Sequence, residues 1–437
     1  MDRHIRLGGV LLGLVLLTTA CLPQGVRLPQ SEFLGLLARK SGLIAYLGAD
    51  GNVYTVDQGG GKPQPITTDA SIGDSYRVYG LPSWARDAQS LAFAAYVGQG
   101  QDDPTQTSLM VARKDGSGLN EIYASEDFLI YYYWSPDSQR IGLISDTPGS
   151  ALALKLVPSA GGEAQTVDVG QPYYWTWAAD SRALLVHAGD NSTGGPSRLA
   201  LLRLDGGVTE QGLAVTPSLF KAPAFSPDGT QALVAGQVDG KSALLLTDAA
   251  GKVARTVADY TGNIAFAWSP DGKRAAYIAS EAGSVGVLGP IVIVDPAEAA
   301  DPVTLEGDPA YAFFWAPDSQ SIAYFSPHQV ATETPTPAAG AIDSTSSDIV
   351  WSLSVANTRS GASRSIATFV PTDRFLQLLP YFDQYHQSVT IWSPDSQNLV
   401  VSAYGSDSQP GIWVVAASGS LEPRPVAPGL IAVWSWQ

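Results

Sequence analysis

The chain has little of the chemistry on which most enzymes and metal proteins depend. Its 437 residues include a single cysteine, Cys21, so no disulfide can form within the chain. It has four histidines, His4, His187, His328 and His386, and no two of them have the spacing of a metal-ligand pair. We find no Gly-rich phosphate loop and no G-x-S-x-G nucleophile motif. These absences predict neither a cofactor nor a metal, and they argue against a nucleotide enzyme and an α/β-hydrolase.

Charge and long apolar runs are also scarce. Only 15% of the residues are charged, and acidic residues outnumber basic ones to give a formal net charge of −16. An acidic surface disfavours nucleic acid and anionic lipid surfaces as partners. The apolar stretch 7–17 is too short to span a bilayer, and no later segment is long and apolar enough to do so.

One five-residue phrase recurs along the chain: an aromatic residue, a small residue, Pro, Asp, and then Ser or Gly. Weaker copies begin at Trp84 and Trp177. The aromatic residues lie about 43–50 residues apart, with one longer interval, and this period in a strand-rich chain is typical of a β-propeller with four-stranded blades. The clear copies begin at Trp134, Phe225, Trp268, Trp315 and Trp392.

The phrase predicts a tight turn rather than a catalytic or metal-binding carboxylate. Pro presets φ for the first central position of the turn, and Asp can accept hydrogen bonds from nearby backbone amides. The aromatic residue before the turn ends a strand, and we expect it to pack between neighbouring blades, where a flat ring buries a large area.

The two ends of the chain predict how the ring closes. The first strand-like unit, 43–47, has no phrase before it, and the last residues, 430–437, supply the missing opening strand with Trp434. We therefore expect one all-β propeller whose N- and C-terminal strands share a blade, which removes the exposed sheet edge. Seven internal openings and the shared blade predict eight four-stranded blades, with seven as the alternative. Residues 327–348, rich in Pro, Thr, Ala and Ser, predict a disordered hairpin insertion.

The N-terminus predicts export. Residues 1–20 have a basic start, a short apolar core and small residues before Cys21, as in a secretory signal peptide. The end of this segment resembles the bacterial lipobox, with Thr18 in the place that usually holds Leu. The resemblance implies a lipidated Cys21, a lipid-anchored tether over 21–42 and a propeller over 43–437, held outside the cytoplasm in the periplasm or at the cell surface. The alternative is an ordinary signal peptide with an incidental cysteine.

The phrase W-S-P-D-S/G is followed by an apolar strand, such as residues 275–279, and later by a strand end with Asp and Gly. This pattern resembles the TolB-type, WD-like propeller repeat. The resemblance covers residues 43–437 and implies the fold. It implies no single function, because such propellers occur in scaffold proteins, in the non-catalytic domain of prolyl-oligopeptidase-type peptidases and in lipoproteins. Only about 20 residues separate Cys21 from the first strand, too few for the additional domain of TolB itself.

The segments before the repeated aromatic residues are rich in aromatic and acidic side chains, and we expect them to meet at one mouth of the central channel. Tyr and Trp are favoured at interaction sites, and flat rings beside carboxylates also suit stacking on sugars. The alternative is that these rings pack between blades. The candidate binding residues are Tyr76, Tyr131, Tyr173, Tyr260, Tyr311, Asp383, Tyr385 and His386.

These features favour a non-catalytic binding or scaffold module, monomeric and membrane-tethered, for a protein or a glycan of the cell envelope. A second hypothesis is a carbohydrate-active or hydrolytic propeller enzyme that uses Asp383, His386 and neighbouring tyrosines. A third is a sensory or assembly component of an envelope complex. The sequence predicts no bound nucleic acid under any of the three hypotheses.

Overall fold

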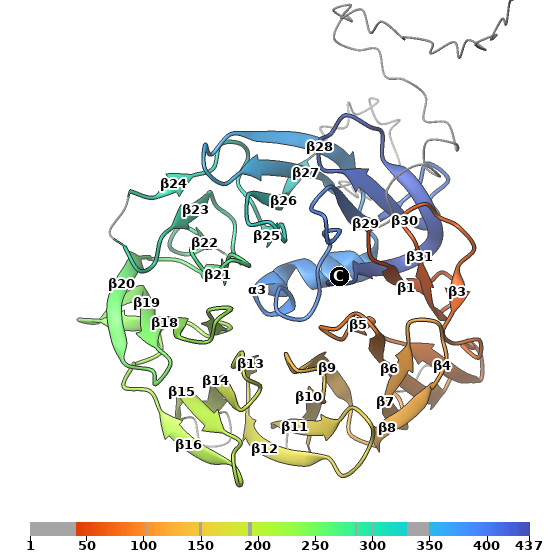
Figure 1. Ribbon diagram of the computed structural model, residues 1–437, viewed down its shortest axis with the longest axis horizontal. Coiled ribbons are helices and arrows are strands. Elements are labelled where there is room, and N and C mark those ends of the chain that lie inside the picture. Colours follow the sequence, from red (N-terminus) through yellow and green to blue (C-terminus); the bar gives the residue numbers. More distant parts are fainter. Residues whose placement is uncertain are drawn as a thin grey trace, which may run out of the picture.

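The computed structural model describes residues 41–100, 103–147, 151–190, 195–284, 286–298, 301–329 and 349–437. Within these ranges the chain is a ring of small antiparallel sheets around a central axis (Figure 1). The expected signal peptide, Cys21, nearly all of the tether and most of the insertion lie outside the described residues. No helix in the described ranges has the length and apolar character that a bilayer crossing requires.

Five sheets have four strands each, in consecutive order along the chain. They contain β9 (Leu129–Trp134), β10 (Arg140–Asp146), β11 (Leu152–Pro158) and β12 (Gln165–Gly170); β13 (Tyr173–Trp177), β14 (Ala183–Asp190), β15 (Gly195–Arg203) and β16 (Thr209–Gly212); β17 (Ala224–Phe225), β18 (Gln231–Val238), β19 (Lys241–Asp248) and β20 (Val253–Asp259); β21 (Ile264–Trp268), β22 (Ala275–Ala279), β23 (Ile291–Val294) and β24 (Val303–Thr304); and β25 (Ala312–Trp315), β26 (Ser321–Gln329), β27 (Ile349–Asn357) and β28 (Ser363–Phe369).

Two sheets are larger. One joins β4 (Ser75–Tyr79), β5 (Ser83–Trp84), β6 (Ser90–Gln99), β7 (Gln106–Arg113) and β8 (Asn120–Ser125). The other has the strand order β29 (Asn398–Tyr404), β30 (Pro410–Ala416), β31 (Arg424–Trp434), β1 (Ile44–Gly48), β2 (Val53–Val56) and β3 (Gln64–Pro65). The N-terminal strand β1 pairs with the C-terminal strand β31, from Ile44 opposite Trp434 to Gly48 opposite Gly429. Closure of the ring by both chain ends is confirmed.

The expected eight separate blades are not supported. The described strands form seven sheets, so the propeller has seven blades, the alternative count. The difference arises at β31, which has 11 residues and serves two sequence repeats. Residues 424–428 pair with β30, and residues 429–434 pair with β1. The repeat that begins at Trp392 and the repeat shared by the chain ends are therefore joined in one six-stranded sheet.

Burial within each sheet falls from the middle strands to the outer edge. The middle strand β10 is buried along five consecutive residues because neighbouring sheets cover both of its faces. The outermost strand β16 is exposed at all four residues. The innermost strands are aromatic, as in β9 and β13, and their rings fill the narrow space where the sheets converge.

The repeated turn has the structure that its residues predict. The Ser135 hydroxyl donates to the Asp137 carboxylate over 2.6 Å, and the same carboxylate accepts from the Gln139 amide. The last position of the turn lies in the left-handed region, with φ of 59° at Ser138 and 70° at Gly272, a conformation that Gly adopts without steric cost. Asp in the phrase is therefore a turn residue, and that prediction is confirmed.

The repeated tryptophans connect neighbouring sheets by one recurring hydrogen bond. The indole N–H donates to the backbone carbonyl of the residue just before the aromatic residue of the preceding repeat. Trp134 donates to Ser83 over 3.0 Å, and Trp268 donates to Ala224 over 3.0 Å. Trp392 makes the equivalent bond to Phe314. The expected packing of these rings between sheets is thus accompanied by a directional bond.

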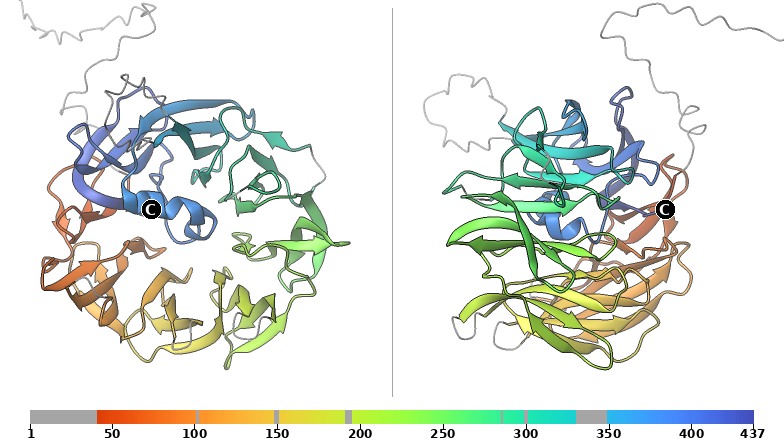
Figure 2. Two further views of the ribbon diagram at one scale, coloured as in Figure 1. Left: turned by 180° about the vertical axis from the view of Figure 1, so that it is seen from behind. Right: turned by 60° about the vertical axis from the view of Figure 1, so that its left-hand side comes forward.

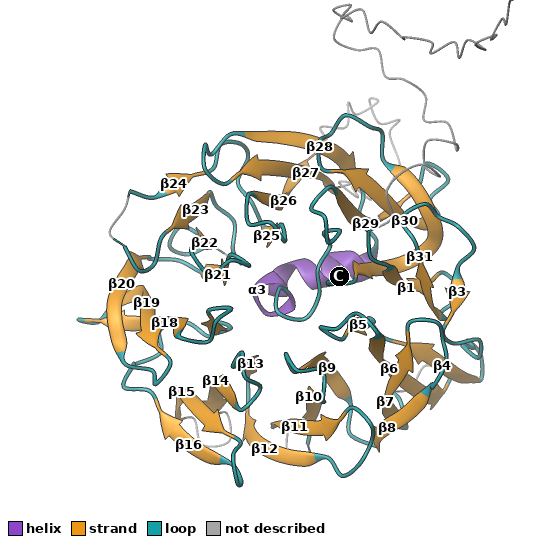
Figure 3. Cartoon of the chain, in the orientation of Figure 1, coloured by secondary structure: helices purple, strands orange, loops and turns teal. Residues whose placement is uncertain are grey.

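A helical segment occupies the centre of the ring (Figures 1 and 2). It consists of α2 (Asp373–Leu378), a 3₁₀ turn η1 (Leu379–Tyr381) and α3 (Phe382–Tyr385), and it is the only helical part within the described ranges (Figure 3). The Thr372 hydroxyl caps α2 by accepting from the Phe375 amide. Phe375, Leu379 and Phe382 are buried, so the segment forms part of the core. We call residues 372–388 the plug.

Candidate functional site

Two cavities lie against the plug. The first, the central cavity, has a volume of about 470 Å³. Its walls are rings of the repeated phrase, among them Trp177, Trp268 and Trp315, and phrase prolines such as Pro227 and Pro270 also line it. The plug contributes Asp383, His386 and Gln387. The exposed prolines mark the outer side of this cavity, and the buried Asp383 marks its inner end.

The second cavity, the aromatic groove, has a volume of about 390 Å³ and lies between the plug and the sheets of β4–β8 and β9–β12. Helix α2 contributes Arg374 and Gln377, both exposed. A groove of this volume is in the range of small-molecule sites. The aromatic residues that line it are Tyr76, Tyr79, Tyr96, Phe128, Tyr131, Tyr132 and Tyr385.

The predicted site residues do not meet at one mouth. Asp383 and His386 line the central cavity, whereas Tyr76, Tyr131 and Tyr385 line the aromatic groove. Neighbouring plug residues face different cavities because the segment is helical at this point, and a helix turns successive side chains to different sides. A single continuous mouth would have required these residues to lie on an extended loop, whereas the plug is helical.

Three predicted residues line neither of these cavities. Tyr173 is buried, and its hydroxyl donates to Asp168 over 2.6 Å. Tyr260 is buried beside Ser218, with which its hydroxyl shares a hydrogen bond. Tyr311 packs edge-on against Trp351, with ring centroids 5.4 Å apart. All three rings have contacts within the propeller, which is the alternative interpretation of these residues.

Asp383 is buried and His386 is partly buried. Burial raises the pKa of Asp383, and the nearby charge of Lys221 partly offsets this. Burial also lowers the pKa of His386 to about 4, and the positive charge of Arg86 adds to the effect. The His386 Nε2 atom accepts from the Trp315 backbone amide over 3.3 Å. His386 is therefore neutral at pH 7, and its lone pair is directed at the sheet.

Tyr131 and Tyr385 form the contact between the plug and the groove wall. Their rings meet edge-on, with centroids 5.1 Å apart, and Tyr131 also packs edge-on against Trp175. The Tyr131 hydroxyl donates to the Gln384 carbonyl over 3.2 Å. Burial raises the pKa of Tyr131 well above its ordinary value and that of Tyr385 to about 12. Both phenols therefore remain neutral at physiological pH, and they present ring surface rather than charge.

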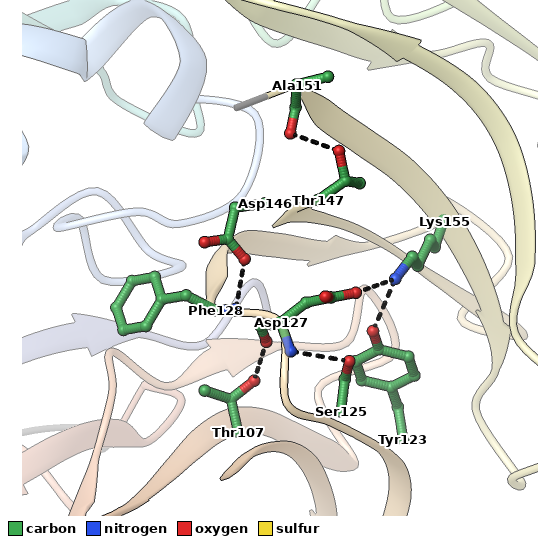
Figure 4. Close-up of polar contacts among 9 residues, drawn as sticks. All are labelled: Thr107, Tyr123, Ser125, Asp127, Phe128, Asp146, Thr147, Ala151 and Lys155. Carbon is green, nitrogen blue, oxygen red and sulfur yellow. Dashed lines mark hydrogen bonds and ion pairs between the residues drawn. The ribbon is translucent and has the colours of Figure 1, made fainter. Parts of the chain in front are cut away.

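Phe128 stands at the edge of the groove, stacked on Tyr96 with ring centroids 5.2 Å apart. Polar contacts hold the turn from which it projects (Figure 4). The Phe128 amide donates to Asp146 over 2.5 Å, and the Asp127 carbonyl accepts from Thr107 over 2.7 Å. Phe128 is nevertheless 41% exposed, so a pre-positioned ring face is available to a ligand.

Lys155 secures the same turn from the neighbouring strand β11. Its ammonium group lies 3.2 Å from the Asp127 carboxylate and 2.9 Å from the Tyr123 hydroxyl. These contacts outweigh the cost of burial and raise the pKa of Lys155. Because the turn is bonded on both sides, the Phe128 ring does not need to be ordered when a ligand arrives.

The sequence did not single out Arg86, Arg374 or Trp436 as site residues, whereas Phe128 stands in one of the aromatic-rich segments that precede the repeated aromatic residues. Arg86 had a usable signal, since it occupies the proline position of the weak phrase at Trp84. Arg374 and Trp436 had none, because their places depend on how the plug and the sheets meet. In the described ranges no group of three His, Cys, Asp or Glu side chains could hold a metal ion.

No protein-family model matches the chain, and a search of curated proteins gave no match. Solved structures do match it. An oligogalacturonate lyase from Vibrio parahaemolyticus is 13% identical with a TM-score of 0.52, over 86% of this chain and 98% of that one. The dihydro-heme d1 dehydrogenase NirN is also 13% identical with a TM-score of 0.52, over 95% and 78%.

TolB from Acinetobacter baumannii is a more distant likeness, 14% identical with a TM-score of 0.38 over 82% of this chain and 81% of that one. At these identities the comparisons show a shared propeller fold. The β-propeller fold that the resemblance implied is confirmed by the arrangement of the sheets.

Proposed function

We propose that this protein is a non-catalytic binding module whose aromatic groove holds a glycan of the cell envelope. The observation that carries the proposal is the convergence of seven aromatic side chains and two exposed polar ones in one groove of about 390 Å³. The proposal includes the lipid anchor at Cys21, which would place the groove outside the cytoplasm near its ligand.

The composition of the groove favours a sugar over a protein surface. Standard protein interfaces bury roughly 800 Å² on each partner, usually on a broad face, whereas this groove is small and concave. Several tyrosine hydroxyls in it are already bonded within the protein, such as Tyr132 to Leu81 and Tyr96 to Leu129. The groove therefore offers ring faces for stacking, and Arg374 and Gln377 supply hydrogen-bond donors at its side.

The enzyme hypothesis has one favourable observation, since Asp383 and His386 both line the central cavity. Their surroundings argue for a structural role. His386 Nε2 is occupied by the Trp315 amide, and the Asp383 carboxylate accepts from the Gln384 amide over 2.9 Å. A general base needs a lone pair directed at the substrate. We therefore prefer binding without catalysis.

The test is co-sedimentation of the full-length protein, in detergent, with purified insoluble peptidoglycan. Phe128→Ala removes the exposed ring at the groove edge and should weaken binding about three- to tenfold, the value of one aromatic contact. Tyr381→Ala is the matched control, because Tyr381 is an exposed plug aromatic that lines neither cavity.

Equal binding by the two variants would show that the groove is not the site. Absence of wild-type sedimentation, together with a protein partner that depends on Phe128, would replace the glycan with a protein ligand.

A further inference from the structure

Three repeats depart from the phrase at its proline position. The copy that begins at Trp177 has the small residue Ala179 there, and two neighbouring repeats have large residues. In the clear copies this position is Pro, as at Pro136 and Pro270. In the copy that begins at Trp84 it is Arg86, and in the final copy, which begins at Trp434, it is Trp436. Proline is the residue that best suits the turn, so a change to Arg and Trp in adjacent repeats indicates a second requirement there.

The two exceptional side chains contact each other at the central cavity. The Arg86 guanidinium lies 3.8 Å from the centre of the Trp436 ring, and both residues line the cavity. One Arg86 N–H donates to the Gln387 carbonyl of the plug over 2.5 Å. The Trp436 indole donates to the Trp84 carbonyl over 3.3 Å. The guanidinium is therefore fixed by one hydrogen bond and one ring, which leaves further N–H donors of its fork for another partner.

Arg86 has no carboxylate partner within the described ranges. Arg198, by contrast, pairs with Asp168 and Glu210. Arg140 and Arg274 also lie over phrase tryptophans and donate to backbone carbonyls, but neither of them lines the cavity. Burial lowers the pKa of Arg86 only to about 10, so it remains a cation at pH 7. It is the single cationic side chain among the residues that line the cavity.

We propose that the central cavity binds a cyclic monocarboxylate, with its carboxylate on Arg86 and its ring against the phrase tryptophans. The fork of a guanidinium matches a carboxylate in two parallel hydrogen bonds. One cation in a protein with a net charge of −16 balances one negative charge better than the two of a phosphate. Trp177, Trp268 and Trp315 line the cavity, so a ligand ring would lie against an apolar wall. This site is separate from the aromatic groove and does not depend on the glycan proposal.

The test uses benzoate as the probe, with ligand-observed saturation-transfer NMR on the full-length protein in detergent. Benzamide has the same ring without the charge, and acetate has the charge without the ring. Benzoate should bind at least tenfold more tightly than benzamide, the value of one charge-assisted hydrogen bond or more. It should also bind more tightly than acetate, because its ring is buried against the tryptophans. Glucuronate and glucose, compared in the same way, distinguish a sugar acid from an aromatic acid as the ligand.

Arg86→Gln should weaken benzoate binding about tenfold, and Arg86→Lys should retain part of it. Arg140→Gln is the matched control, since Arg140 lies over Trp177 but outside the cavity, and it should bind benzoate like the wild type. Near-UV circular dichroism confirms that each variant is folded.

If Arg86→Gln folds and binds benzoate unchanged, Arg86 serves only to hold the C-terminal Trp436, and the proposal is wrong. Equal affinity of the wild type for benzoate and benzamide overturns it without any variant.

Discussion

The recurring indole hydrogen bond allows its contribution to be measured by a matched pair of substitutions. Trp268 and Trp177 occupy the same position of the phrase, and they are 6% and 5% exposed. The Trp268 indole donates to the Ala224 carbonyl over 3.0 Å. The Trp177 indole has no hydrogen-bond partner within the described structure. Replacement by Phe removes the same atoms at both sites, so the difference between the variants reports the hydrogen bond.

We expect Trp268→Phe to lower the free energy of unfolding by about 1–2 kcal/mol more than Trp177→Phe. The assay is urea unfolding followed by far-UV circular dichroism, with the slope of each transition compared to confirm that the same surface is exposed. Trp134→Phe serves as a repeat, because Trp134 makes the equivalent bond to Ser83.

The contact of Arg140 with the Trp177 ring, at 5.4 Å, acts against the prediction, since its loss adds to the cost of Trp177→Phe. A measured difference in the expected direction therefore understates the hydrogen bond. If Trp177→Phe is as destabilising as both bonded variants, the indole bonds do not contribute to stability and ring packing alone joins the sheets.

Three further outcomes are expected. Phe375→Ala, in the fully buried part of the plug, should lower the free energy of unfolding in urea by about 3–5 kcal/mol. Leu376→Ala, at the exposed neighbouring position, should change it little. Equal effects would mean that the plug is not part of the core. Because burial raises the pKa of Asp383, the wild type should lose stability as the pH rises from about 3.8 through that pKa. Asp383→Asn should not show this loss when both proteins are compared by thermal unfolding. Parallel pH profiles of the two proteins would contradict the prediction. Gly272→Ala, at φ 70°, should lower the free energy of unfolding by about 1–2 kcal/mol in the same urea assay. Gly212→Ala, with open space around the residue, should leave it unchanged. Equal values for the two variants would exclude backbone strain as the reason for Gly in the phrase.

Much of the fold was predictable because it is local and repeated. The phrase sets a turn, its aromatic residue sets a buried position, and seven internal copies with matching chain ends set a closed ring. The grouping of strands into sheets was not predictable. It depends on whether β31 bends or continues between its pairing with β30 and its pairing with β1, and no residue pattern distinguishes the two.

The candidate site was predicted only in part. Asp383, Tyr385 and His386, which the sequence placed in a segment before a repeated aromatic residue, do line the two cavities against the plug. The segment was expected to be a loop at a mouth, but its apolar residues at 375, 378, 379 and 382 follow the helical period and are buried. Composition alone could not predict the positions of Tyr173, Tyr260 and Tyr311. A tyrosine before a strand packs inward or outward according to its neighbours.

The sequence by itself determined the all-β class, the propeller, its closure by both ends and the structural role of the repeated Asp, since each follows from short-range chemistry repeated along the chain. Only the tertiary structure decided which aromatic rings face a cavity and which face another sheet. It also decided that a plug divides the central space, and that Arg86 meets Trp436. Contacts between residues hundreds of positions apart depend on the final packing of the ring, which no local pattern encodes.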